Sequence, residues 1–170
     1  MLGFLFRRLT AARDRGTALF HAVTAEARMP HWYVEGTVPD TIDGRFGVLA
    51  TVMSLALVRL ERLGDEGSAL SVGVTERFIE VMESEHRELG LGDPTLGKTI
   101  RKLVGSLARR TELWREALAG NTEWNRAARA SLYSNDVSSD ALIHSARALE
   151  LLWQRLQRTD AAHLEKGKLQ

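Results

Sequence analysis

The sequence predicts an all-α protein, a single-domain bundle of about six helices with an irregular segment after the first helix. Apolar residues recur along most of the chain at the spacing of one helical face, and the alternation typical of strands never exceeds a few residues. Only 3 of the 170 residues are proline and 14 are glycine, which leaves little room for long linkers. The hydrophobic content of 44% suits one sizeable core, so residues 1–170 are predicted to form one domain.

The first three helices are delimited by helix-breaking residues. The first covers about 10–28, and two prolines keep the following segment, 29–40, irregular. The second covers about 41–63 and contains thirteen consecutive uncharged residues. A membrane-spanning helix needs roughly 20, so we interpret this one as a buried central helix. The third covers about 68–89, and its apolar residues face one way: Val74, Phe78, Met82 and Leu89.

The fourth helix has the clearest pattern, between breaks at Gly90 and Gly120. Its apolar positions follow i, i+4, i+7, i+8 spacing and form one stripe that must pack on the core. The members of the stripe are Leu96, Ile100, Leu103, Val104, Leu107, Thr111, Trp114 and Leu118. A short fifth helix covers about 122–133, and Ser138 caps a sixth, which completes a bundle over 10–160. Residues 161–170 are polar and are predicted to form a frayed tail.

A tight corner is predicted between the third and fourth helices. Gly90 tolerates the left-handed conformation that closes a helix, and Asp93 offers an N-cap followed by a first-turn proline, Pro94. The corner would hold Arg87 and Glu88 near the amide-rich start of the fourth helix. Taken alone, this chemistry is common in helix hairpins.

Charge is segregated although the net charge is only +1. Residues 61–93 carry nine acidic and three basic side chains, whereas residues 94–130 carry eight basic and three acidic ones. Four cations are predicted to form one outward strip opposite the apolar stripe: Lys98, Arg101, Lys102 and Arg109. Such a strip can meet RNA phosphates, anionic lipid or an acidic partner. The alternative is a solvated face, partly neutralised by the nearby Glu76, Glu80 and Glu83.

No catalytic constellation stands out, so the chain is predicted not to be an enzyme and to carry no metal or other cofactor. Glu83-x-x-His86 has the spacing of a di-iron ligand pair, but no second Glu-x-x-His exists in the sequence. Metalloprotease, P-loop, nucleophile-elbow and dinucleotide motifs are all absent. The lack of cysteine excludes a disulfide framework and suits a reducing compartment, the cytoplasm.

The first nine residues place apolar side chains before arginines, the reverse of a secretory signal. Two interpretations of this segment stay open. It is either a membrane-proximal interfacial segment, with apolar groups in the acyl region and arginines at the headgroups, or the start of a helix docked on the bundle. The residues of the membrane interpretation are Phe4, Leu5, Phe6, Arg7 and Arg8.

Three segments, taken in order, resemble the ubiquinol-cytochrome c chaperone family. They are Asp40-Thr-Ile-Asp-Gly-Arg-Phe46 before the long apolar helix, Arg87-Glu-Leu-Gly-Leu-Gly-Asp93 at the corner, and the amphipathic stretch from Lys98 to Arg109, with an aromatic near Trp114. The resemblance covers roughly residues 30–135. The family has a glycine-arginine pair after an aromatic in the fourth helix, where this chain has Leu107-Ala-Arg109, so any contact specific to that pair is in doubt.

The resemblance implies an all-helical, non-enzymatic assembly chaperone for the cytochrome bc1 complex. Its client would be newly made cytochrome b, and it would act at the inner face of the cytoplasmic membrane. The ribosome or a second assembly factor would be a further partner, and no binding to DNA is expected. We expect the basic strip to meet partners. Five other residues are expected to shape the fold around a binding surface or to bind a partner: Asp43, Arg45, Arg87, Glu88 and Asp93. The alternative is a ribosome- or RNA-associated adaptor that uses the same basic strip.

Overall fold

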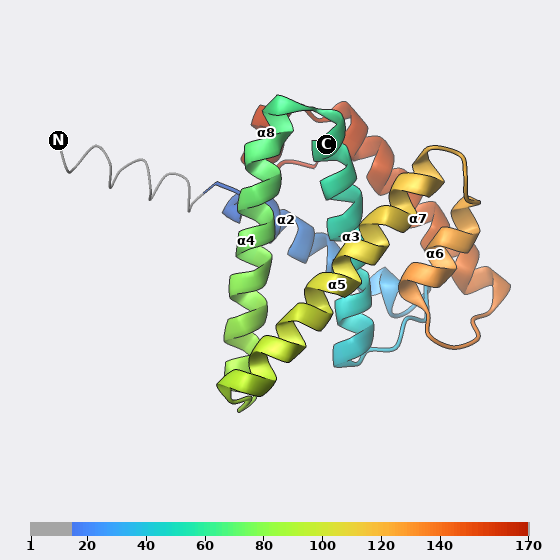
Figure 1. Cartoon of the computed structure of the whole chain (residues 1–170). Coiled ribbons are helices and arrows are strands. Elements are labelled where there is room, and N and C mark those ends of the chain that lie inside the picture. The colour runs from blue at the N-terminus through green and yellow to red at the C-terminus, as the bar shows by residue number, and fades with distance from the viewer. Residues whose placement is uncertain (1–14, 170) are drawn as a thin grey trace.

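One long helix, α3 (Ile42–Arg62), runs through the centre of the structure, a computed structural model that describes residues 15–169 (Figure 1). Every residue from 47 to 58 except Leu49 is buried on this helix. Helices on several sides pack against it, α5 most extensively. The buried central helix predicted from the uncharged run is therefore confirmed.

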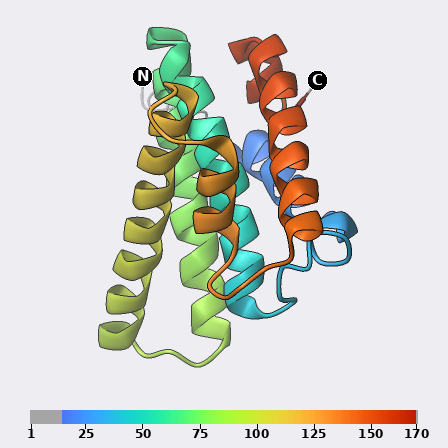
Figure 2. The same ribbon diagram turned by 90° about the vertical axis from the view of Figure 1, so that its right-hand side faces the viewer.

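The described residues form seven α-helices and one 3₁₀ turn, with no strand, which confirms the all-α fold class. The helices around α3 are α2 (Thr17–Ala27), α4 (Asp65–Glu88), α5 (Asp93–Leu118), α6 (Trp124–Leu132), α7 (Ser139–Arg158) and α8 (Ala161–Glu165). The 3₁₀ turn η1 (Pro30–Trp32) lies in the segment predicted to be irregular. Figure 2 shows α4 and α5 joined at the lower end of the bundle, and α6 next to α7.

The corner between α4 and α5 closes as a Schellman motif. Gly90 has a φ of +86°, and its N–H donates to the carbonyl oxygen of Arg87 at 2.9 Å. Leu91 N–H donates to the carbonyl oxygen of His86 at 3.2 Å. The predicted N-cap at Asp93 is wrong by one residue. The N-cap is Gly92, whose backbone is extended and whose carbonyl oxygen accepts from the N–H of Leu96 at 2.8 Å. Asp93 therefore lies inside the first turn, where its negative charge interacts favourably with the positive end of the helix dipole.

Three arginines stabilise the bundle by donating to carbonyl oxygens near the C-terminal ends of other helices. The carbonyl groups in the last turn of a helix receive no regular hydrogen bond from a residue four positions further on, so they can accept one from a neighbouring helix. The bonds are Arg59 Nε to Leu156 O at 2.9 Å, Arg62 Nη2 to Leu118 O at 3.2 Å, and Arg110 Nε to Ser131 O at 3.0 Å. Arg62 also lies 5.0 Å from the ring centroid of Trp153.

The predicted frayed tail is wrong for its first half, because residues 161–165 form helix α8. The side chain of Asp160 accepts from the N–H of His163 at 2.8 Å and caps this helix. Leu164 is 1% exposed and belongs to the core. The burial of one leucine and a well-formed cap order this polar segment against α2 and α4.

Two histidines tie the segment after α2 to helix α7. His31 Nδ1 lies 3.1 Å from His144 Nε2, and both rings are partly buried. Burial, and next the charge of His144, lower the pKa of His31 from its ordinary value of 6.5. Protonation of His31 is therefore disfavoured in the folded chain.

Acidification is expected to destabilise the fold through His31. The unfolded chain takes up the proton at the ordinary pKa, so the stability that His31 contributes is complete above pH 6.5 and is lost as the pH falls through its lower folded-state pKa. The melting temperature should drop between pH 7.5 and 5.5, and less steeply in His31→Gln. His21→Gln, a change at an exposed histidine, is the control. Equal slopes for wild type and His31→Gln would contradict the assignment.

Candidate functional site

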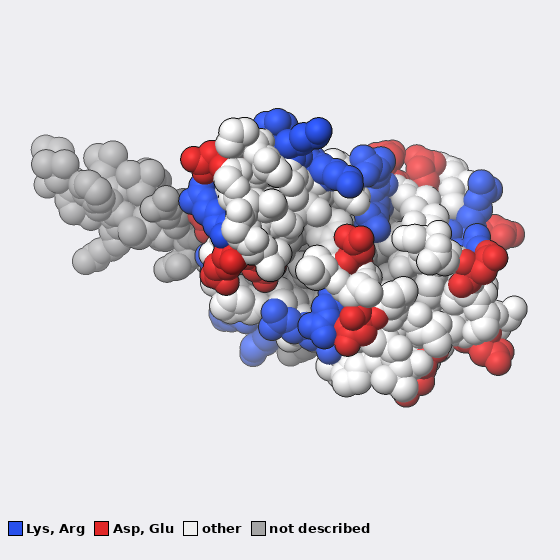
Figure 3. All heavy atoms as spheres, turned by 90° about the horizontal axis from the view of Figure 1, so that it is seen from below, with Lys and Arg blue, Asp and Glu red and all other residues white. Residues whose placement is uncertain are grey.

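The four cations of the predicted basic strip are all exposed on α5. The opposite side of the helix fixes this orientation, since Leu96, Ile100 and Leu107 are buried in the core. Figure 3, which views the molecule from below, shows basic side chains gathered along the edge where α5 lies in front in Figure 1. We define Lys98, Arg101, Lys102 and Arg109 as the basic strip.

None of these four cations forms an ion pair with any residue between 15 and 169. The expected neutralisation by α4 does not take the form of direct pairs. Glu80, for example, pairs with Arg77 of its own helix at 3.2 Å. The basic strip is thus available to a partner, and its role in binding remains a prediction.

The entry to α3 explains why Asp-Thr-Ile-Asp-Gly-Arg occurs there. The Thr41 hydroxyl accepts from the N–H of Gly44 at 3.2 Å and caps the helix. Arg45 Nε donates to Asp40 Oδ1 at 2.5 Å, and this hydrogen bond lowers the pKa of the Asp40 carboxyl. A side chain at Gly44 would collide with the carbonyl oxygen of Pro39, so glycine is needed for close approach. Arg45 thus contacts the segment before the helix, Asp43 is exposed, and a fold-shaping or binding role of these two residues stays a prediction.

The remaining predicted fold-shaping residues lie at the α4–α5 corner. Arg87, Glu88 and Asp93 are all exposed, so Arg87 and Glu88 are not a buried internal pair. The backbone of Arg87 contributes to the Schellman motif, but its side chain is free to meet solvent or a partner. Partner binding by these three residues stays a prediction.

A large apolar groove, which sequence reasoning missed, lies between the start of α3 and the end of α4. Its volume is about 860 Å³, and α2, the segment after it, α3, α4 and α5 all contribute to its walls. We call floor the apolar lining residues that are buried or half-buried, among them Phe20, Phe46, Leu49, Met82 and Leu103. Figure 3 looks onto this end of the molecule and shows it hollowed. Among the predicted site residues, Asp43 and Arg45 line the groove.

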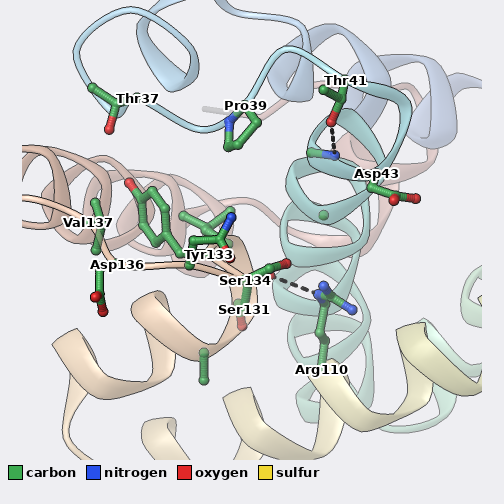
Figure 4. A pocket seen from close by; sticks show the side chains of 15 residues that line it. Thr37, Pro39, Thr41, Asp43, Arg110, Ser131, Tyr133, Ser134, Asp136 and Val137 are labelled. Carbon is green, nitrogen blue, oxygen red and sulfur yellow. Dashed lines mark hydrogen bonds between the residues drawn. The ribbon is translucent and has the colours of Figure 1, made fainter.

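A smaller cavity of about 470 Å³ lies between the start of α3, α5 and the segment after α6 (Figure 4). Arg110 reaches into it and is held by Ser131 O and by the Ser106 hydroxyl, at 3.0 and 2.5 Å. Burial, and next the charge of Arg109, lower the pKa of Arg110. Its hydrogen bonds to α6 make this arginine a structural clamp. In the sequence, its place at the margin of the apolar stripe was the only signal that distinguished it from the exposed cations.

The five residues of the predicted membrane contact, Phe4 to Arg8, lie outside the described residues. Between residues 15 and 169, no helix is long and apolar enough to cross a membrane. The Glu83-x-x-His86 pair lies on α4, where His86 Nδ1 is hydrogen-bonded to the carbonyl oxygen of Met82 at 2.7 Å. Within residues 15–169, no three His, Cys, Asp or Glu side chains cluster so that they could hold a metal ion.

Comparisons with known proteins agree with this architecture. The family model described as "Ubiquinol-cytochrome C chaperone" matches residues 35–170. The crystal structure of the Cbp3 homolog from Brucella abortus superposes with a TM-score of 0.78 and 25% sequence identity, covering 99% of this chain and 95% of that one. No curated protein matches the chain significantly. The matched region contains α3 to α8, and with them the basic strip and most of the groove.

Proposed function

Because this chain belongs to the ubiquinol-cytochrome c chaperone family, we propose that it is an assembly chaperone of the cytochrome bc1 complex that binds newly made cytochrome b at the membrane surface. The match of the family model over residues 35–170 is the observation that carries the proposal. A chaperone for a membrane protein must hold apolar segments reversibly and work close to the bilayer. Two surfaces of the described chain suit these two tasks.

The groove suits the holding of apolar segments. A groove between amphipathic helices binds a partner by burying apolar surface, and it releases the partner when other subunits cover that surface. Val34 and Ile42 on its rim are 69% and 68% exposed, so apolar surface extends outward from the floor. Removing this surface from water is the driving force available for client binding.

The basic strip suits a position at the membrane. Anionic headgroups attract clustered Lys and Arg side chains, and the four cations of the strip lie on one exposed face of α5. The apolar and arginine residues between Phe4 and Arg8 would add an interfacial contact. These features support the proposal that the protein acts in the cytoplasm, peripherally on the inner face of the cytoplasmic membrane. The ribosome or a second assembly factor is proposed as a further partner.

Co-purification tests the identity of the client. An affinity-tagged chain, expressed in the organism that carries the gene and solubilised in mild detergent, should enrich cytochrome b peptides over an untagged control. Enrichment should grow when haem synthesis is limited, since unassembled cytochrome b then accumulates. Recovery of other membrane proteins in equal yield, with no enrichment of cytochrome b, would contradict the proposed client.

The second candidate function is a ribosome- or RNA-associated adaptor, which the unpaired cations of the basic strip favour. An adaptor should bind RNA with an affinity that falls steeply as salt rises, because binding releases counterions from the phosphates. Replacing Lys98 and Lys102 by glutamate should abolish that binding. Absence of RNA binding at every salt concentration would exclude the adaptor.

A further inference from the structure

We infer that the groove between α3 and α4 binds an amphipathic helix that carries basic residues along one flank; this inference deepens the proposed function and rests on it. The shape of the groove favours a helix over a small molecule. The apolar surface of the groove continues from the floor onto the exposed rim at Val34 and Ile42. A small-molecule site, in contrast, encloses most of its ligand. An amphipathic helix can cover floor and rim together with anchors at i, i+3, i+4 and i+7.

The charges on the rim favour a basic flank. Asp40 and Arg45 pair with each other and cancel. Asp43 on α3 and Glu85 on α4 are exposed, line the groove, and form no ion pair within residues 15–169. Asp43 also lines the smaller cavity, but in Figure 4 its carboxylate points away from the other labelled side chains of that cavity. Two unpaired carboxylates therefore face the space that a bound helix would occupy.

The opposite, α2 side of the groove carries Arg28, which forms no ion pair within residues 15–169. Two histidines, His21 and His86, also line the walls. This polarity orients the ligand. Its basic flank would lie toward α3 and α4, and a neutral or acidic flank toward α2. An apolar helix with lysines or arginines along one edge matches the charge bias of membrane-protein segments on the cytoplasmic side.

Two model peptides of about 18 residues, or five helical turns, test the inference. Both place leucine on one face, and the polar face carries lysine in one peptide and glutamate in the other. Fluorescence anisotropy should show that the lysine peptide binds about tenfold or more tightly than the glutamate peptide. The double variant Asp43→Asn, Glu85→Gln should remove that preference. Equal affinity of the two peptides for the wild-type chain would overturn the inference.

A second pair of variants tests the apolar contact. Val34→Ser with Ile42→Ser should weaken the lysine peptide about tenfold or more, because it removes exposed anchors without touching the core. The matched control is Val72→Ser with Ile143→Ser, which changes the same residue types at exposed positions outside the groove. An equal loss in the control would overturn the inference. Sedimentation gives a second way to overturn it. If the wild-type chain is a dimer and the Val34→Ser, Ile42→Ser variant is a monomer, a second copy of the chain occupies the groove.

Complementation of a gene deletion separates this inference from the proposed function. If the intact gene restores the bc1 complex and the lysine peptide does not bind the groove, the groove inference is wrong and the chaperone proposal stands. If the deletion leaves the bc1 complex unchanged while the peptide binds as described, the chaperone proposal is wrong and the groove inference stands.

Discussion

Replacing Lys98 and Lys102 by glutamate is expected to weaken binding to anionic vesicles at least thirtyfold. Each Lys near an anionic surface contributes about 1 kcal/mol, so the loss of two costs about 2 kcal/mol, and the introduced carboxylates add repulsion. Both lysines are exposed and form no ion pair in the described chain, so the folded structure should tolerate the change. Sedimentation of the protein with vesicles of 30% phosphatidylserine, compared with neutral vesicles, measures the effect.

A matched reversal elsewhere shows whether position or net charge matters. Lys166→Glu with Lys168→Glu makes the same change in net charge at two exposed lysines after α8. This control should retain most of the vesicle binding. Equal losses in the two double variants would mean that vesicles respond to overall charge, and the basic strip would lose its assigned role.

Replacing Trp114 by alanine is expected to lower the free energy of unfolding by about 3–5 kcal/mol, enough to unfold a marginal domain. Trp114 is fully buried, and its ring lies 4.8 Å from that of Trp124 in an edge-to-face arrangement. The substitution opens a cavity where α5 meets the core and removes this aromatic pair. Urea unfolding, followed by far-UV circular dichroism, gives the free energy.

Phenylalanine replacements at two buried tryptophans provide the control. The Nε1 of Trp114 has no hydrogen-bond partner among residues 15–169, whereas that of Trp32 donates to the carbonyl oxygen of Glu26 at 2.9 Å. Trp114→Phe should therefore cost less than Trp32→Phe, by about 1 kcal/mol, the usual net value of one hydrogen bond. The reverse order would show that packing, and not hydrogen bonding, distinguishes these two sites.

Periodicity and break residues predicted most of the fold. The buried members of the stripe on α5 are among those chosen from spacing, because a helix with apolar residues on one side must bury that side. The bounds of α3 were predicted within about one residue from Thr41 and Gly64, since capping chemistry is local. Local signals fail where tertiary contacts decide, as at α8, where Leu164 has a place in the core that its polar neighbours concealed.

The candidate site was predictable only in part. The basic strip follows from residue spacing on one helix, and the structure confirms that its members are exposed together. The groove could not be predicted, because it forms only where the stretch from Phe20 to Leu49 meets α4 and α5, which are distant from it in sequence. Arg110 shows the same limit. In the sequence only its place at the margin of the apolar stripe distinguishes it from Arg109, yet Arg109 is exposed and Arg110 clamps the end of α6.

The most direct test of the proposed chaperone is the dithionite-reduced spectrum of membranes from a strain that lacks the gene. We expect specific loss of the b- and c-type haem bands of the bc1 complex. The intact gene should restore those bands, and a gene that carries Lys98→Glu and Lys102→Glu should not. An unchanged bc1 spectrum in the deletion strain would contradict the proposed function and favour the RNA adaptor.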